Sequence, residues 1–209
     1  MKIAILGATG KTGGHATKHA LAQGHTVRAL ARDPSKLSEK DPLLEVIQGD
    51  ATNVADCARL VEGCDAVFAA VGPQGMGTTT VRQDIARAVT AAMKQAGVKK
   101  LVWLSAFGVG ENLAQARRTS WFATLFMKTL LKKTYVDAAA AEAVLRASGL
   151  DVVLARPPRL TDGPSSRALV AIPESDKVPR LTCTREDVAK WMLDAAATTS
   201  FDRQAVTIC

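Results

Sequence analysis

The stretch that decides the fold is Lys2-Ile3-Ala4-Ile5-Leu6-Gly7-Ala8-Thr9-Gly10-Lys11-Thr12-Gly13, near the start of the 209-residue chain. The apolar run 2–6 predicts a buried strand, and three glycines at three-residue spacing follow it directly. Gly7 permits a tight turn, Gly10 lets the backbone approach a pyrophosphate, and Gly13 lets a helix pack on the strand. In this context the pattern predicts a dinucleotide site at the N-terminus of a helix.

The rest of the chain continues this alternation of strands and helices. Short apolar runs without polar alternation are typical of buried parallel strands, and the stretches between them carry apolar residues at helical spacing. The pattern predicts an α/β fold, with a Rossmann-type doubly wound parallel sheet, in a single domain spanning residues 1–209. The expected strands are 2–6, 26–31, 44–48, 65–70, 99–104, 151–155 and 205–208, and the expected helices are 13–23, 53–62, 79–96 and 136–148, which end at Gly24, Gly63, Gly97 and Gly149.

A small C-terminal extension follows the sixth expected strand. Arg156-Pro157-Pro158 and a loop rich in Gly, Pro and Ser come first. Thr184-Arg185-Glu186-Asp187 is then a capping pattern that opens a helix ending near residue 197. We expect this extension to pack over the carboxyl edge of the sheet and to form one wall of a substrate cleft.

Composition narrows the classes of protein to consider. Apolar residues make up 47% of the chain, too many for a disordered protein, and no apolar run is long enough to span a membrane. The net charge of +7 suits an anionic small ligand, nucleic acid or an anionic membrane surface. Because the basic residues form no run longer than two, we expect no nucleic-acid binding. The first strand begins directly after Met1 and the four cysteines show no CxxC spacing, so we expect a cytoplasmic protein with reduced thiols and no metal site.

The end of the second expected strand distinguishes NAD from NADP. An acid there binds the ribose hydroxyls of NAD, whereas an arginine binds the 2′-phosphate of NADP. Arg32 offers a planar, charged fork that suits phosphate, and Lys36 lies one helical turn further along. The sequence favours NADP. Asp33 keeps NAD open as an alternative, and Arg32 could also be a solvated surface charge.

An ordered set of motifs runs nearly from end to end of the chain. After the glycine turn come Leu30-Ala31-Arg32-Asp33, Gly49-Asp50-Ala51, Ser105-Ala106-Phe107-Gly108, and Leu145-Arg146-Ala147-Ser148-Gly149-Leu150 followed by Arg156-Pro157. Together they resemble the atypical short-chain dehydrogenases/reductases, and most closely the NAD(P)H-binding group that includes biliverdin reductase B (flavin reductase) and NmrA-like proteins.

The resemblance implies roles for residues at the carboxyl ends of several strands. Phe107, Tyr135 and Arg159 are the implied substrate contacts. The implied cofactor contacts are Gly7, Thr9, Gly10, Lys11, Thr12 and Gly13 around the pyrophosphate, Arg32 at the 2′-phosphate, Asp50 and Ala51 beside the adenine, Val71 and Gly72 under the cofactor, and Ser105, Pro157 and Pro158 near the nicotinamide.

The chain departs from the conventional short-chain dehydrogenases, which use a tyrosine and a lysine four residues later as proton donor and activator. Tyr135 is the only tyrosine, and Ala139 stands where the lysine would be. Glu111 and Asp137 are the acids nearest the expected cleft, but the sequence pairs neither with a base, so we expect both to be structural. The chain therefore lacks an evident general acid/base pair.

This lack favours hydride transfer from NADPH to a small, flat aromatic acceptor, such as a flavin, quinone or tetrapyrrole, that takes its proton from water. Ser105 is the candidate catalytic residue. The three histidines, His15, His19 and His25, lie on or next to the first helix, where we expect a core or solvated role. The alternative is a non-catalytic, NADP-binding redox sensor of the NmrA-like type.

The segment 108–134 carries an amphipathic pattern. Three interpretations stay open: core packing, a hydrophobic lid over the acceptor, or a surface that meets a partner or a membrane. The apolar face comprises Trp121, Phe122, Leu125, Phe126, Thr129 and Leu130, opposite Thr124, Lys128 and Lys132.

Overall fold

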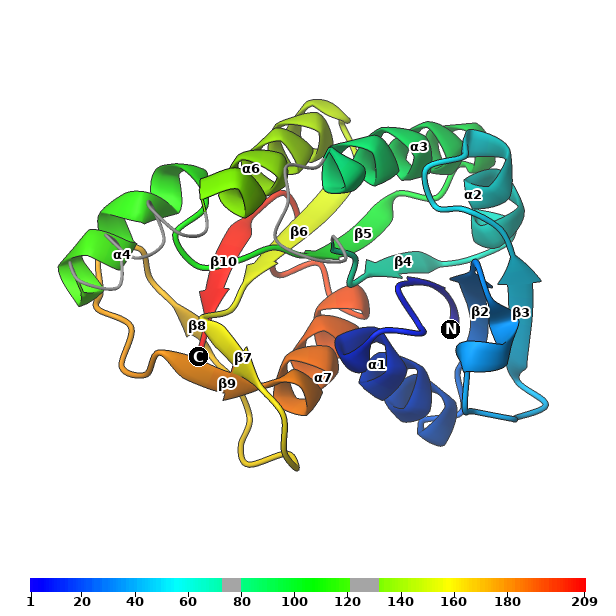
Figure 1. Ribbon diagram of the computed structural model, residues 1–209, viewed down its shortest axis with the longest axis horizontal. Coiled ribbons are helices and arrows are strands. Elements are labelled where there is room, and N and C mark those ends of the chain that lie inside the picture. Colours follow the sequence, from blue (N-terminus) through cyan, green and yellow to red (C-terminus); the bar gives the residue numbers. More distant parts are fainter. Residues whose placement is uncertain (73–79, 121–131) are drawn as a thin grey trace.

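The central sheet of the computed structural model has the strand order β3-β2-β1-β4-β5-β6-β10-β8, and the structure describes residues 1–72, 80–120 and 132–209 (Figure 1). All neighbouring strands pair in parallel except β8, which is antiparallel to β10. The strands are β1 (Lys2–Leu6), β2 (Thr26–Ala31), β3 (Leu44–Gln48), β4 (Ala66–Ala69), β5 (Lys100–Leu104), β6 (Asp151–Arg156), β8 (Ala171–Ile172) and β10 (Ala205–Ile208).

Helices cover both faces of this sheet (Figure 1). On one face α1 (Lys11–Ala22) packs beside α7 (Arg185–Ala196), and on the other α2 (Val54–Val61), α3 (Val81–Ala96) and α6 (Lys132–Ala147) lie side by side. The side chains of β1 alternate between the two cores: Ile3 and Ile5 are in the first, Ala4 and Leu6 in the second. Burial on both faces explains why the strands read as continuous apolar runs.

The predicted Rossmann-type, doubly wound fold is confirmed. The seven predicted strands are present, with ends within one residue of those predicted. Gly24, Gly63, Gly97 and Gly149, which were predicted to end helices, all have positive φ, between 66° and 76°. Strand order reverses between β2 and β4 on either side of β1, which makes the carboxyl end of β1 the switch point where such sheets bind ligands.

The C-terminal extension contains elements that the sequence analysis did not predict. β7 (Arg159–Thr161) pairs in parallel with β9 (Thr182–Thr184). The helix α4 (Leu113–Thr119), which lies before the extension, was not predicted either. Strands of two or three residues are too short to show a period in the sequence. The predicted helix cap is present, because the Thr184 hydroxyl accepts the N–H of Asp187 at 3.1 Å.

The structure also bears on the expected lack of a membrane span and on the amphipathic segment 108–134. None of the described helices is both long and apolar enough to cross a membrane. Most of the amphipathic pattern in 108–134 falls on residues 121–131, which lie outside the described residues.

The four cysteines are free and buried, and burial raises the pKa of Cys57 and of Cys183 to about 12, so both thiols stay protonated at neutral pH.

Candidate functional site

The turn between β1 and α1 leaves no room for a side chain at Gly7 or Gly13. Gly7 has a φ of 86°, and a Cβ atom there would lie 2.3 Å from the carbonyl oxygen of Ala70, just beyond β4. A Cβ atom on Gly13 would lie 2.1 Å from the carbonyl oxygen of Gly7. Both positions therefore require glycine, and three backbone segments converge at the switch point.

The first turn of α1 presents backbone N–H groups at this point. Gly10 is the N-cap and has no side chain with which to cap the helix. The N–H groups of Lys11, Thr12 and Gly13 belong to the first helical turn, where they have no intrahelical partner. Thr9, Gly10 and Lys11 are exposed. Such N–H groups, together with the positive end of the helix dipole, suit a phosphate.

Lys11 links this turn to the C-terminal extension. Its ammonium nitrogen lies 2.6 Å from one carboxylate oxygen of Asp162, and Arg185 binds the other oxygen at 2.6 Å. Both Lys11 and Asp162 are mostly exposed, so the pair adds little stability. A phosphate bound at the turn would compete with Asp162 for Lys11. The sequence analysis missed Asp162, which lies 151 residues from Lys11.

The end of β2 presents an arginine and an acid with different surroundings. Arg32 is exposed, and within the described part of the chain its guanidinium makes no ion pair. The Asp33 carboxylate accepts the Ser35 hydroxyl at 2.6 Å and the Ser35 N–H at 3.1 Å, and so caps the short helix η1 (Pro34–Lys36). These bonds lower the pKa of Asp33. Asp33 is thus engaged locally, whereas Arg32 is available to an anion.

Asp50 and Ala51 follow β3 beside Arg32. Asp50 accepts the N–H and the hydroxyl of Thr52, each at 2.8 Å, and its own N–H donates to Asp56 at 2.8 Å. The bonds from Thr52, with a smaller contribution from the charge of Arg32, lower the pKa of Asp50. The loop that is expected to flank the adenine is therefore held by its own hydrogen bonds.

Val71 and Gly72 follow β4, and Gly72 lies next to the partly buried Arg82. A Cβ atom on Gly72 would lie 3.2 Å from a guanidinium nitrogen of Arg82. Asp137 on α6 accepts the backbone N–H groups of Arg82 and Gln83, each at 3.2 Å, at the start of α3. Asp137 thus joins two helices, in keeping with the structural role expected for it.

A buried polar cluster lies at the carboxyl ends of β5 and β6. The Ser105 hydroxyl donates to a Glu142 carboxylate oxygen at 2.5 Å, and Arg156 binds both oxygens of Glu142, with its Nε at 3.0 Å from one. Arg156 also reaches Glu111 at 3.1 Å. Arg156 is fully buried and Glu142 nearly so. Burial opposes the charge of Arg156, but the hydrogen bonds and charge of Glu142 outweigh it and raise the pKa of Arg156.

The sequence analysis did not predict the ion pair between Glu142 and Arg156. Glu142 lies on the buried stripe of α6, between Ala138, Ala141 and Leu145. Arg156 ends an apolar strand. A buried acid on one element and a buried base on another are the signal that could have paired them, because neither charge is stable alone in a core.

The Tyr135 hydroxyl forms a hydrogen bond with the protein backbone. Its hydroxyl lies 2.9 Å from the carbonyl oxygen of Phe107, to which it donates, and burial raises the pKa of Tyr135 to about 12. One turn later on α6 stands Ala139. Phe107 itself is buried in a small cluster with Ala116, Val178 and Cys209.

Two prolines directly follow β6. Pro157 and Pro158 are buried, and the Pro157 carbonyl accepts the N–H of Phe107 at 2.9 Å. Arg159 in β7 is exposed. The ends of β5 and β6 therefore bring Ser105, Phe107 and the two prolines together, whereas Arg159 is exposed to solvent.

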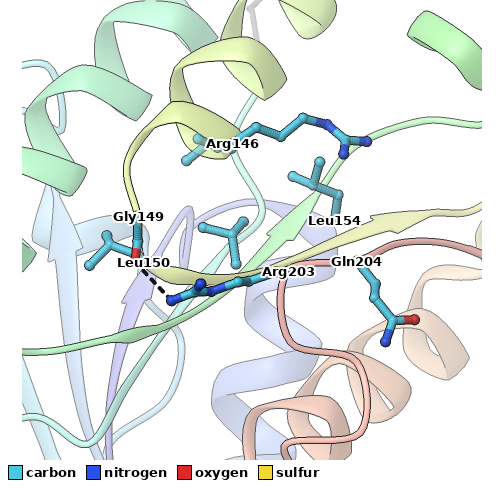
Figure 2. A pocket seen from close by; sticks show the side chains of 8 residues that line it. Arg146, Gly149, Leu150, Leu154, Arg203 and Gln204 are labelled. Carbon is cyan, nitrogen blue, oxygen red and sulfur yellow. Dashed lines mark hydrogen bonds between the residues drawn. The ribbon is translucent and has the colours of Figure 1, made fainter.

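A separate pocket lies at the opposite edge of the sheet (Figure 2). Its volume is about 240 Å³, and it is lined by Leu145, Arg146, Gly149, Leu150, Val152, Leu154, Arg203 and Gln204. Arg203 reaches over it to the Gly149 carbonyl at 3.3 Å. This pocket adjoins the amino end of β6, so it is not part of the site at the carboxyl ends.

The sequence matches a family model over most of its length. Residues 7–199 match a family model described as NAD(P)H-binding. An uncharacterized chloroplastic protein of Arabidopsis thaliana is 31% identical over 213 residues, with 93% of this chain and 71% of that protein covered. The 3β-hydroxysteroid dehydrogenase/Δ5→4-isomerase of Mycobacterium tuberculosis is 31% identical over 168 residues. That match covers 73% of this chain but only 44% of the enzyme, so the chain aligns with less than half of this relative.

Solved structures share the fold over the whole chain. ChuY, an anaerobillin reductase from Escherichia coli O157:H7, has a TM-score of 0.81 at 20% identity, with 100% of this chain and 96% of ChuY covered. A short-chain dehydrogenase/reductase from Veillonella parvula in complex with NADP has a TM-score of 0.77 at 20% identity, with coverage of 99% and 93%. At these identities the likeness establishes the fold alone.

Proposed function

This chain belongs to the NAD(P)H-binding family, and we propose that it is an NADPH-dependent reductase that transfers hydride to a small, flat aromatic acceptor of the flavin, quinone or tetrapyrrole class. One observation carries the proposal: at the carboxyl ends of β5 and β6, the hydroxyls of Ser105 and Tyr135 already donate to protein oxygens. A substrate that needs a proton from the enzyme would find both donors engaged. An acceptor that takes its proton from water would not need them.

The surroundings of Arg32 and Asp33 support NADPH over NADH. Asp33 is held by Ser35, whereas Arg32 is exposed and unpaired within the described residues. A guanidinium can bind the 2′-phosphate with two parallel hydrogen bonds, and NADH offers no such group. The Veillonella neighbour binds NADP.

The residues at the switch point fit the rest of the cofactor. A side chain at Gly10 would occupy the space in front of the helical N–H groups, and Lys11 adds a positive charge beside them. When bound, NADPH supplies the hydride, and the protein's contribution is to orient the nicotinamide and shield it from water.

Ser105 is suited to orienting the nicotinamide. A serine hydroxyl has one proton, and Ser105 donates it to Glu142, which Arg156 holds in place. Toward the site Ser105 can then only accept a hydrogen bond. The nicotinamide carboxamide carries an NH₂ group that can donate one. Glu142 would act as a positioning residue, because it fixes the direction of the Ser105 proton.

The test is NADPH oxidation by the purified protein, measured against FMN, quinones and a linear tetrapyrrole, with NADPH affinity measured in parallel. The proposal predicts acceptor-dependent oxidation with at least one class of acceptor. Tight NADPH binding without oxidation by any of them would reject the reductase and support the redox sensor. Weak binding of NADPH and NADH alike would reject both.

A further inference from the structure

Two histidines and a glutamate form a cluster where α1 packs beside α7, one helical turn along α1 from Lys11. His15 and His19 are four residues apart, so they lie one turn apart on the same side of α1. Glu186 lies in the first turn of α7. One ring nitrogen of each histidine and one carboxylate oxygen of Glu186 all lie within 4.8 Å of one another. All three residues are partly exposed, so the cluster is open to an ion from solvent.

The His19–Glu186 distance is close to that of two ligands of one ion, and the His15 nitrogen lies within 4.8 Å of both atoms. Zinc binds imidazole nitrogen at about 2.0–2.1 Å and carboxylate oxygen at about 2.0–2.2 Å, so two ligands of a tetrahedral zinc lie about 3.3 Å apart. The Nε2 atom of His19 lies 3.1 Å from Oε1 of Glu186. We propose that His15, His19 and Glu186 form a binding site for Zn²⁺ that ties α1 to α7, with water as the fourth ligand.

The surroundings of Glu186 support this assignment. Its second oxygen, Oε2, accepts the backbone N–H of Ser165 at 2.8 Å, and the Ser165 hydroxyl is bound to Asp187 at 2.7 Å. The loop therefore holds the carboxylate so that Oε1 faces His19. Hydrogen bonds of this kind orient the ligands in metal sites.

One neighbouring group opposes the ion. The ammonium nitrogen of Lys190, one turn further along α7, lies 3.2 Å from the same Oε1 of Glu186. Zinc must displace this ammonium, and its positive charge lowers the affinity of the site. The sequence analysis expected no metal site because the cysteines show no CxxC spacing. Glu186 lies 167 residues from His19, so the sequence does not show that the three side chains meet.

The experiment titrates ZnCl₂ into the full, untagged protein by calorimetry, and repeats the titration with Co²⁺, whose visible absorption reports tetrahedral coordination. We expect one zinc per chain. His15→Ala, His19→Ala and Glu186→Gln should each weaken binding by more than about 100-fold, beyond the loss caused by removing an outer-shell partner. His25→Ala is the matched control, since His25 lies beyond the end of α1, and it should bind zinc as the unmodified protein does.

Lys190→Ala provides an independent test, because it should tighten zinc binding rather than weaken it. Zinc should also raise the melting temperature of the unmodified protein and of His25→Ala, but not that of His15→Ala or His19→Ala. The site is rejected if the unmodified protein binds no zinc, if His25→Ala loses as much affinity as His19→Ala, or if Lys190→Ala weakens binding. None of these measurements requires reductase activity.

Discussion

The phosphate end of the candidate site is made of backbone, whereas the proposed nicotinamide end is made of side chains from distant parts of the chain. At the first end, Gly7, Gly10 and Gly13 lie within seven residues. At the second, Ser105 and Glu142 are 37 residues apart; Ser105 directly follows β5 and Glu142 belongs to α6. The first end depends on the absence of side chains at its glycines. The second end depends on a buried ion pair between Glu142 and Arg156. The two ends should therefore respond to mutation in different ways.

The largest effect expected is on stability at the side-chain end. Glu142→Ala leaves the Arg156 guanidinium buried without its main counter-charge. Removal of one partner of a buried ion pair costs about 3–5 kcal/mol, and we expect a loss of this size in the free energy of unfolding, measured with urea.

Glu111→Ala is the matched control for this prediction. Glu111 pairs with the same Arg156, but its side chain is 54% exposed. Its removal should cost less than about 1 kcal/mol. Equal losses of unfolding free energy in the two variants would mean that burial of the acid does not determine how much its ion pair with Arg156 stabilises the protein.

The second prediction concerns the backbone end. In Gly10→Val the new side chain would project over the N–H groups of the first turn of α1, in the space that a pyrophosphate must occupy. A Cβ atom there lies 3.1 Å from the Gly7 carbonyl oxygen, a contact that a small shift relieves. We expect NADPH binding to be lost, by more than about 100-fold on the affinity scale, while the protein still folds, as checked by calorimetry and circular dichroism.

Gly14→Ala is the control for the glycine turn, because a Cβ atom at Gly14 would make an ordinary contact of 3.5 Å with the Ala8 carbonyl oxygen. This variant should bind NADPH as the unmodified protein does. Unchanged affinity in Gly10→Val would place the phosphate site elsewhere.

The contrast between residues close together in the sequence and residues far apart in it also explains which features were predictable. The strands and most helices were predictable because each is specified by apolar periodicity and a glycine within a short window, as in β1 and its turn. The pair Glu142 and Arg156 was not, because the helix that carries the acid and the strand that carries the base meet only in the folded chain. Asp162 was missed for the same reason, and β7 and β9 because three residues carry no period.

The third prediction tests the cofactor preference, which depends on one side chain, Arg32, directly after β2. A charge-assisted bond to phosphate contributes about 1.5–3 kcal/mol, so Arg32→Ala should weaken NADPH binding by about 10- to 150-fold. NADH affinity should stay almost unchanged. Parallel titrations with both cofactors decide the matter, and an equal loss for the two would mean that Arg32 does not read the 2′-phosphate.

The smallest effect expected is on turnover in Tyr135→Phe. The Tyr135 hydroxyl donates to the Phe107 carbonyl, and Ala139 stands where an activating lysine would be. If the protein only positions the nicotinamide, removal of this hydroxyl should reduce turnover by less than about tenfold, far short of the 10²–10⁴ expected for loss of a general acid. Ser105→Ala should reduce turnover more, because it removes the acceptor proposed to orient the carboxamide, and both variants should keep their NADPH affinity. Steady-state rates with the best acceptor from the panel, beside NADPH titrations, measure both effects. A collapse of turnover in Tyr135→Phe alone would show that the side-chain end contains a conventional proton donor after all.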